Sequence, residues 1–348
     1  MQRLGPERRH KIVNGATSRA AHARLFERNP ALNRLELGPP PAPAPLPNPA
    51  RIAFWNAERC KHPGPSAALL RRAGADAILL CEMDMGMART GQVHTTRDLA
   101  ERLKQGYVFA VEFLELGLGN ELEQARHAGA QNRDGLHGAG ILAPCPLQRP
   151  VLMRLEADGA WFDGKNGERR IGGRIAIATM VEIAGVAIAL VSVHLESHGD
   201  PVQRAGQMRD LIEAVDAYAG DAPVLIGGDF NTKSVPRDQF WDPDNRRDAM
   251  AADPLRLIDP VPHEPLFEVA AGAGYDWVAC NRPGPTERLL PHEPRAPLAR
   301  LDWFFCRGLA AADPEIHPAV DAEGGAISDH DLLVVTISPE TPDEVRHI

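Results

Sequence analysis

The sequence has no apolar run that approaches the length of a membrane-spanning helix, although 44% of its 348 residues are hydrophobic. Its N-terminus carries charged residues and no apolar core segment, so we do not expect a Sec signal peptide. No internal repeat recurs at a fixed period, which argues against a solenoid or a propeller. At this length the chain can bury a large core, and its composition is that of a globular protein.

Cysteine is scarce, and its spacing is not that of a metal site. The sequence contains five cysteines, an odd number, with no CxxC motif and no Cys/His zinc pattern. Reduced, mostly structural thiols in a cytoplasmic protein are therefore expected. The five positions are Cys60, Cys81, Cys145, Cys280 and Cys306.

An excess of positive charge is also missing. The formal net charge is -9, no long Lys/Arg block occurs, and only 5% of the residues are aromatic. A protein that grips long nucleic acid gains affinity from a basic face and often stacks bases on aromatic side chains. The composition disfavours a nucleic-acid partner, while leaving a local basic groove open.

Proline is plentiful near the N-terminus and separates residues 1–50 from the rest of the chain. A basic, weakly helical segment at about 7–34 leads into the Pro/Ala tract 39–49, which is expected to be extended and solvated. We interpret 1–50 as a Pro-rich tail or a strap over the surface. Residues 51–340 are expected to form the functional domain.

From residue 51 the pattern changes to strands alternating with helices. Strands that occur in runs, with helices following singly, favour two packed sheets flanked by helices over a doubly wound parallel sheet. The segments 115–136 and 232–299 are predicted to be long irregular regions. Strands are expected at 52–56, 77–81, 107–113, 139–142, 151–155, 174–183, 186–194, 224–226, 300–306 and 332–337, and helices at 66–73, 95–104 and 201–218.

The stretch 222–234 contains the most informative polar residues. Its apolar run 224–226 predicts a buried strand, and Gly227-Gly228 punctuates the strand's end. Asp229 and Asn231 follow two positions apart, so their side chains leave the same face if the strand geometry persists. A Gly-Asp turn with an Asn cap is the alternative interpretation.

Polar residues also end several other predicted strands. Any one of them is more often a cap or a satisfied polar group than a catalyst. Together they supply amides, carboxylates and imidazoles that can hold a hard divalent cation and transfer protons. The set comprises Asn56, Glu82, His194, Asp229, Asn231, Asp302, Asp329 and His330.

These motifs resemble the endonuclease/exonuclease/phosphatase superfamily, the DNase I-like metal-dependent phosphoesterases. The matching blocks occur in the family's order and cover about residues 51–338. The resemblance implies an α/β fold, the four-layer αββα sandwich of two packed, mainly antiparallel sheets flanked by helices, with the site at one edge. The blocks are Trp55-Asn56, Cys81-Glu82, 138–142, 192–196, Gly228-Asp229-Phe230-Asn231, Leu301-Asp302 and Ser328-Asp329-His330.

The resemblance also implies a metal cofactor. By analogy, Asn56 and Glu82 hold Mg²⁺ or Mn²⁺, and Asp329 lies near the ion or its waters. Phosphoester hydrolysis requires charge on the non-bridging oxygens to be neutralised and a water to be positioned, which a divalent ion accomplishes.

The same resemblance assigns catalytic roles. Asp229 and Asn231 orient the attacking water and the phosphoryl oxygens, and Asp229 is a candidate base for that water. His330, paired with Asp302, stabilises or protonates the phosphate, and His194 is a second imidazole that faces it. A carboxylate behind His330 would raise the pKa of the imidazole.

Three further residues are candidates for substrate binding. His137 stands before Gly138, where relatives often carry an acid or an aromatic residue, and this departure leaves the partner of His194 open. Glu196 and His198 follow the His194 strand closely and are candidates for the entrance of the site. Solvated loop positions are the alternative for these two residues.

The segment 83–97 leaves two questions open. Asp84 is either a second acid of the site or a surface charge. Arg89, His94 and Arg97 either form a basic rim on the phosphate side or only solvate the start of the following helix.

The sequence therefore predicts a Mg²⁺/Mn²⁺-dependent phosphoester hydrolase, in particular a phosphodiesterase acting on a small-molecule or lipid-like phosphoester. A DNA or RNA endonuclease or exonuclease on the same scaffold is the alternative, and a non-catalytic binding module is the third hypothesis. The loops 83–97, 115–136, 156–170 and 232–299 are expected to determine the substrate.

Overall fold

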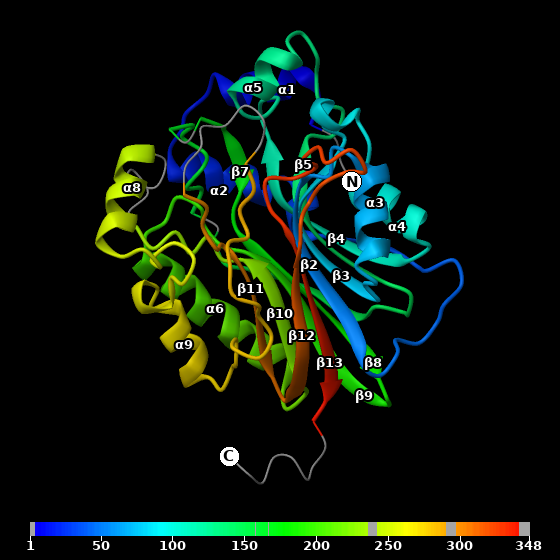
Figure 1. Ribbon diagram of the computed structural model, residues 1–348. Coiled ribbons are helices and arrows are strands. Elements are labelled where there is room, and N and C mark those ends of the chain that lie inside the picture. The colour runs from blue at the N-terminus through cyan, green and yellow to red at the C-terminus, as the bar shows by residue number, and fades with distance from the viewer. Residues whose placement is uncertain (1–3, 157, 166, 236–241, 290–296, 341–348) are drawn as a thin grey trace.

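Two β-sheets pack face to face, and helices cover their outer faces (Figure 1). The computed structural model describes residues 4–156, 158–165, 167–235, 242–289 and 297–340. Most neighbouring strands run antiparallel, and β2–β3 and β9–β10 are the parallel pairs among those described. The predicted four-layer αββα sandwich is confirmed.

The first sheet has the strand order β1-β4-β5-β3-β2-β13-β12, and β7 pairs with the end of β4. Its strands are β1 (Leu35–Gly38), β2 (Ala50–Arg59), β3 (Ala77–Met85), β4 (Gly106–Glu115), β5 (Leu136–Ala143), β7 (Arg170–Gly172), β12 (Leu309–His317) and β13 (Leu332–Pro339). The second sheet has the order β11-β10-β9-β8-β6. Its strands are β6 (Gln148–Arg154), β8 (Ile175–Ile183), β9 (Val186–His194), β10 (Val224–Asp229) and β11 (Asp302–Arg307).

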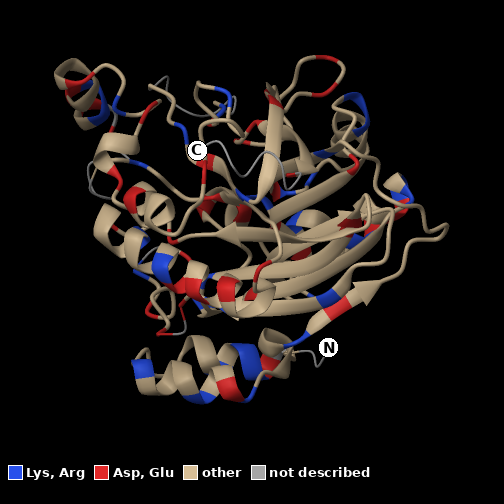
Figure 2. Ribbon diagram, turned by 90° about the horizontal axis from the view of Figure 1, so that it is seen from below, with Lys and Arg blue, Asp and Glu red and all other residues tan. Residues whose placement is uncertain are grey.

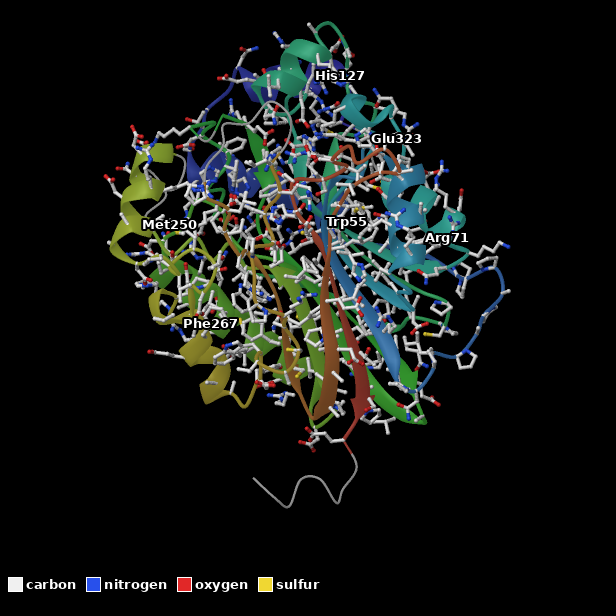
Figure 3. The ribbon with its side chains drawn as sticks, in the orientation of Figure 1. Trp55, Arg71, His127, Met250, Phe267 and Glu323 are labelled. Carbon is white, nitrogen blue, oxygen red and sulfur yellow. The ribbon has the colours of Figure 1, made fainter. Side chains whose placement is uncertain are left out.

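Helices α3 and α4 bury apolar faces against the first sheet, and α6 and α9 do so against the second. Figure 3 shows Phe267, on α9, beside the strands of the second sheet. Among the described residues, no helix is long and apolar enough to cross a membrane. The helices are α1 (Pro6–Val13), α2 (Arg19–Glu27), α3 (Pro63–Arg72), α4 (Thr95–Leu103), α5 (Glu121–Arg126), α6 (Pro201–Ala219), α8 (Pro243–Ala252) and α9 (Leu266–Gly272), with 3₁₀ turns at η1 (Pro30–Asn33), η2 (Ala88–Thr90) and η3 (Val261–His263).

The core between the sheets is built by the alternation of side chains along each strand. In β2, Ile52 and Phe54 face the second sheet, whereas Ala53 and Trp55 face the helices. Because the side-chain period of a strand is two, the next residue on the inter-sheet face is Asn56. The apolar core therefore ends in a polar residue at this end of the sandwich.

The N-terminal segment lies against the first sheet. Strand β1 pairs antiparallel with β4, and Leu32 and Leu46 are buried. His22 on α2 is also buried, and its Nε2 accepts a hydrogen bond from the backbone N–H of Gly172 at 3.1 Å. Residues 41–45 of the Pro/Ala tract are exposed.

Several elements have no strong sequence signal. Helix α5 lies in 115–136, where a capping box of Asn120 and Glu123 closes its first turn. Helices α8 and α9 lie in 232–299, and the edge strand β12 lies beyond 306. These elements are short or half-exposed, so their apolar periodicity is too weak to distinguish them from loops.

Candidate active site

The polar ends of three strands meet in the second sheet. Asp229, the last residue of β10, lies opposite His194 of the parallel strand β9 and opposite Asp302 of the antiparallel strand β11. Residues in register on neighbouring strands point to the same face. Here that face is the one that continues the core between the sheets.

Close packing explains the two glycines before Asp229. A Cβ atom on Gly228 would lie 2.3 Å from Cγ1 of Val193, and one on Gly227 would lie 2.8 Å from the ring of Phe304. Real Cβ atoms do not approach other atoms so closely. Only glycine at both positions lets β10 pack between its neighbours and bring Asp229 into register.

His330 forms a chain with two acids. Its Nδ1 lies 2.8 Å from Oδ2 of Asp302, and its Nε2 lies 3.8 Å from Oδ2 of Asp229. Burial alone would lower the pKa of His330, but Asp302 and then Asp229 outweigh burial and raise the pKa well above its usual value. Burial raises the pKa of Asp302 to about 6 even with His330 beside it.

The segment that carries His330 is fixed by its neighbours. The indole of Trp55, in the middle of the molecule in Figure 3, donates to the backbone carbonyl of His330 at 2.9 Å. The hydroxyl of Ser328 accepts the backbone N–H of His330 at 3.1 Å and donates to the carbonyl of Asn56 at 2.8 Å. These bonds tie the start of the last strand to the end of β2.

Asp229 is the centre of the site. Its Oδ2 accepts the amide of Asn56 at 3.1 Å and lies 3.6 Å from Nε2 of His194, while its Oδ1 accepts the backbone N–H of Asn231 at 2.9 Å. The side-chain amide of Asn231 donates to the carbonyl of Leu195 at 3.0 Å. Gly227 and Gly228 lie within β10, and the bond from the N–H of Asn231 to Asp229 closes a short turn after the strand, within the polar cluster.

The partner of His194 is Glu112, which sequence reasoning missed. The Oε2 of Glu112 lies 3.6 Å from Nδ1 of His194, and its Oε1 accepts NH1 of Arg174 at 2.6 Å. Burial would raise the pKa of Glu112, but Arg174 and then His194 hold it at about 2. The available signal was an acid on the inward face of the otherwise apolar strand β4, a position where carboxylates are rare unless they are paired.

Replacing Glu112 by glutamine is expected to lower kcat by roughly 10²-fold, because His194 loses the carboxylate that faces its Nδ1 and orients its ring. Arg174 retains its bonds to Glu196 and Ser197, so the fold should persist. Steady-state kinetics and thermal unfolding check this prediction. Wild-type turnover in the folded variant would remove Glu112 from the site.

Glu82 and Asn56 stand at irregular strand ends. The register shifts after Asn56 in the β2–β3 pair and after Leu80 in the β3–β5 pair, and Glu82 has a positive φ of 55°. Such bulges re-aim side chains next to active sites. The amide of Asn56 donates to Oε1 of Glu82 at 3.3 Å, and Arg59 donates to Oε2 at 2.7 Å. Burial would raise the pKa of Glu82, but Arg59 foremost holds it well below its usual value.

The donor set fits a hard divalent cation. Among the described residues, no donor lies within hydrogen-bonding distance of the buried Oδ1 of Asp329. Burial foremost, together with Glu58 and Glu82, raises the pKa of Asp329 to about 7 against the opposing effect of His330. Clustered carboxylates of this kind suit Mg²⁺ or Mn²⁺, which prefer oxygen ligands. Oδ1 of Asn56 accepts the backbone N–H of Glu58 at 3.2 Å, so the two carboxylates are the stronger candidate ligands.

A second group of side chains is close enough together to be considered as a metal site. Ligand atoms of Asp229, Asp302 and His330 lie within 4.8 Å of one another, the one such trio of His, Cys or acidic side chains in the described part of the chain. The 2.8 Å contact between His330 and Asp302 has the length of a hydrogen bond. The trio therefore has the geometry of a hydrogen-bonded chain, and Glu82 and Asp329 remain candidate ligands for a cation.

His137 lines the site and is backed by an ion pair. Its Nδ1 lies 2.9 Å from Oδ1 of Asp84, which also accepts from Arg89 at 2.8 Å. Asp84 is fully buried, so the surface-charge alternative is wrong. Arg89 is buried and paired with Asp84. His94 is the N-cap of α4, and its side chain accepts a hydrogen bond from the backbone N–H of Arg97. The basic rim proposed for Arg89, His94 and Arg97 is absent from the cavity lining.

Glu196 lies behind the cavity wall, which corrects its expected place at the entrance. Its Oε2 accepts from Trp161 at 3.0 Å and from Arg174 at 3.2 Å, and its Oε1 accepts the backbone N–H of His198 at 2.9 Å. Its backbone N–H donates to Gln207. His198 does line the cavity, in edge-to-face contact with Trp161 at 4.4 Å.

The site opens into a cavity of about 500 Å³. Three of the four predicted specificity loops contribute to its wall: 115–136, 156–170 and 232–299. The buried Lys233 lies in the wall, and its Nζ donates to the carbonyl of Ser197 at 3.0 Å. Burial lowers the pKa of Lys233 to about 7. The described lining residues are Glu58, Arg59, Lys61, Glu82, Asn120, Glu121, Leu122, Glu123, Arg126, His137, Trp161, Gly167, Glu168, Arg170, Arg174, His194, Ser197, His198, Asp229, Asn231, Lys233, Glu287, Arg288, Leu301, Asp329 and His330.

The sequence profile described as "Endonuclease/Exonuclease/phosphatase family" matches residues 53–330, so the chain belongs to this family. Members of the family are generally phosphoester hydrolases and typically depend on a divalent metal ion. Among curated proteins, none matches this chain.

Solved structures share the fold at low identity. A Beutenbergia cavernae endonuclease/exonuclease/phosphatase is 19% identical over 83% of this chain and 71% of its own, with a TM-score of 0.55. The human Nocturnin catalytic domain with bound sulfate is 15% identical over 88% and 97%, with a TM-score of 0.54. A Bacteroides thetaiotaomicron mannosyl-6-phosphatase is 13% identical over 83% and 99%, with a TM-score of 0.51.

Proposed function

We propose that the protein is a Mg²⁺- or Mn²⁺-dependent phosphoester hydrolase, in particular a phosphodiesterase on a small-molecule or lipid-like ester. The observation that carries this proposal is the convergence of two imidazoles on Oδ2 of Asp229, at 3.6 and 3.8 Å. His330 is backed by Asp302, and His194 is backed by Glu112. A carboxylate between two acid-backed imidazoles can accept a proton from a water while the imidazoles donate to phosphoryl oxygens.

The residues of the site divide this chemistry among them. Asp229 is the proposed base for the attacking water, and Asn231 orients the phosphoryl group beside it. His330 holds its proton because Asp302 and Asp229 raise its pKa, so it can stabilise the phosphate charge or protonate the leaving oxygen. His194 donates to a second oxygen of the phosphoryl group.

Glu82 and Asp329, with Asn56 behind Glu82, are the proposed holders of the cation. A divalent ion bound there would neutralise charge on the non-bridging oxygens in the transition state. His137 and His198 line the cavity and are proposed to contact the substrate.

The charge of the cavity supports a small substrate over a nucleic acid. Among the described residues, seven Lys/Arg and eight Asp/Glu line it, so this part of the wall is not a basic groove. Figure 2 shows Lys and Arg interspersed with Asp and Glu over the ribbon. Duplex binding draws most of its non-specific affinity from unpaired positive charge, whereas here Arg174 and Arg170 are paired with buried acids.

Hydrolysis of bis(p-nitrophenyl) phosphate and of p-nitrophenyl phosphate, with Mg²⁺, with Mn²⁺ and with EDTA, tests the proposal. We expect the diester to be cleaved faster than the monoester, and EDTA to abolish cleavage until metal is restored.

Glu82→Gln should lower the apparent metal affinity by roughly tenfold or more, because a ligand charge is lost.

Plasmid and single-stranded DNA belong in the same assay. Intact DNA beside a cleaved diester supports a small-substrate phosphodiesterase, and nicked plasmid supports a nuclease instead. Faster cleavage of the monoester would point to a phosphatase. Inactivity on every substrate, without metal binding, would contradict the proposal.

We further propose that 51–340 form the catalytic domain and that 1–50 act as a strap on it, because β1 extends the first sheet at β4. The proposed compartment is the cytoplasm, and the five buried, unpaired cysteines support it.

A further inference from the structure

A strained backbone follows the end of β2. Three consecutive non-glycine residues, Glu58, Arg59 and Cys60, have positive φ angles of 44°, 67° and 52°. Side chains with a Cβ atom adopt this left-handed conformation at an energetic cost, which persists only where the surroundings enforce it. The Cα partner of Arg59 across the bulge is Met83, so the turn brings the guanidinium beside Glu82.

Arg59 is held between two acids. Its NH1 lies 2.7 Å from Oε2 of Glu82, and its Nε lies 3.4 Å from Oε1 of Glu123. Its side chain is only 13% exposed. Glu123 is itself fixed, because its Oε2 accepts NH1 of Arg89 and the backbone N–H of Asn120, both at 3.0 Å.

The two oxygens of Glu82 are therefore not equivalent. Oε1 is approached by the amide of Asn56 at 3.3 Å, whereas Oε2 is covered by the guanidinium of Arg59 at the distance of a charge-assisted hydrogen bond. A cation that bound both oxygens would have to displace Arg59, and any cation at Glu82 is repelled by the adjacent positive charge.

We propose that Arg59 occupies Oε2 of Glu82, so that a divalent cation binds this carboxylate through Oε1 alone. The positive charge of Arg59 also lowers the affinity of the site for the cation. Arg59 is thus a positioning residue that determines where the ion binds, and its ion pair with Glu123 connects the segment that carries α5 to the metal site. The inference rests on the proposed function, which places the cation at Glu82.

Arg59→Met is the test, with Mn²⁺ binding to the full chain measured by titration calorimetry. We expect Mn²⁺ to bind roughly tenfold tighter than in the wild type, because the competing charge is gone. We also expect kcat for bis(p-nitrophenyl) phosphate to fall, because the ion can shift toward both oxygens. A merely structural role would not raise metal affinity, since a misplaced Glu82 weakens binding.

Lys61→Met is the matched control. Lys61 lies in the same acidic group, 2.5 Å from Glu58 and 3.3 Å from Glu123, and its contacts are with these two acids. Its loss should change Mn²⁺ affinity by no more than about twofold, because its more exposed charge is better screened by solvent. Arg59→Gln repeats the test with a neutral polar side chain if Arg59→Met does not fold.

Unchanged or weaker Mn²⁺ binding in the folded Arg59 variants would overturn the inference while leaving the proposed function intact, provided that the wild type cleaves the diester. Wild-type protein and Arg59 variants that all bind no Mn²⁺ would overturn both. Binding seen only in the variants would support the role of Arg59 in restraining the site.

Discussion

His330→Ala is expected to lower kcat by roughly 10³-fold, since the substitution removes the imidazole between Asp302 and Asp229. The change in KM should be smaller, because other groups of the cavity still bind the substrate. Steady-state kinetics with the diester, and thermal unfolding to verify the fold, measure this effect.

His263→Ala is the matched control for this substitution. Its Nε2 lies 2.8 Å from Oδ2 of Asp253, the same separation as between His330 and Asp302, but His263 does not line the cavity. We expect unchanged turnover. Equal losses in the two variants would mean that the effect of His330→Ala is one of stability.

The pH dependence gives an independent check. The raised pKa of His330 keeps the imidazolium present below that pKa, and activity that needs it is lost as pH rises through it. Asp302→Asn removes the largest contribution that raises this pKa, so the alkaline loss of kcat should begin at a lower pH than in the wild type. An alkaline limb that stays in place would contradict the assignment.

Arg204→Met is expected to destabilise the protein by about 3–5 kcal/mol, because it leaves a buried carboxylate without its partner. Arg204 and Glu264 are both completely buried and form two contacts, one of them 3.0 Å long. Glu264 also accepts the backbone N–H of Ser234 at 2.8 Å, so the loop that follows Asn231 depends on this pair. Urea unfolding measures the loss of stability, and reduced kcat is expected with it.

Arg209→Met is the control, because Arg209 is exposed on the same helix and its loss should change stability by less than about 0.5 kcal/mol. Adding Glu264→Leu to Arg204→Met should recover part of the stability, since no buried charge is then left unpaired. A loss below about 1 kcal/mol in Arg204→Met would show that Glu264 is neutral or hydrated without its partner.

The fold class was predictable because its signals are local. A nearly continuous apolar run defines strands such as 186–194, and a polar residue ends the apolar face where the core stops, as at Asn56. The motif around Asp229 carries its own turn, since the bond from the N–H of Asn231 to Asp229 spans only two residues. Such features depend on neighbours in the chain.

By itself, the sequence determined which polar residues stand at the strand ends and the family to which their order belongs. Only the tertiary structure decided their partners: Glu112 behind His194, Arg59 on Glu82, and Glu196 behind the wall instead of at the entrance. The physical reason is that these pairs join segments far apart in the chain. Their contacts depend on strand register, on bulges that turn side chains and on burial, and no local pattern specifies these.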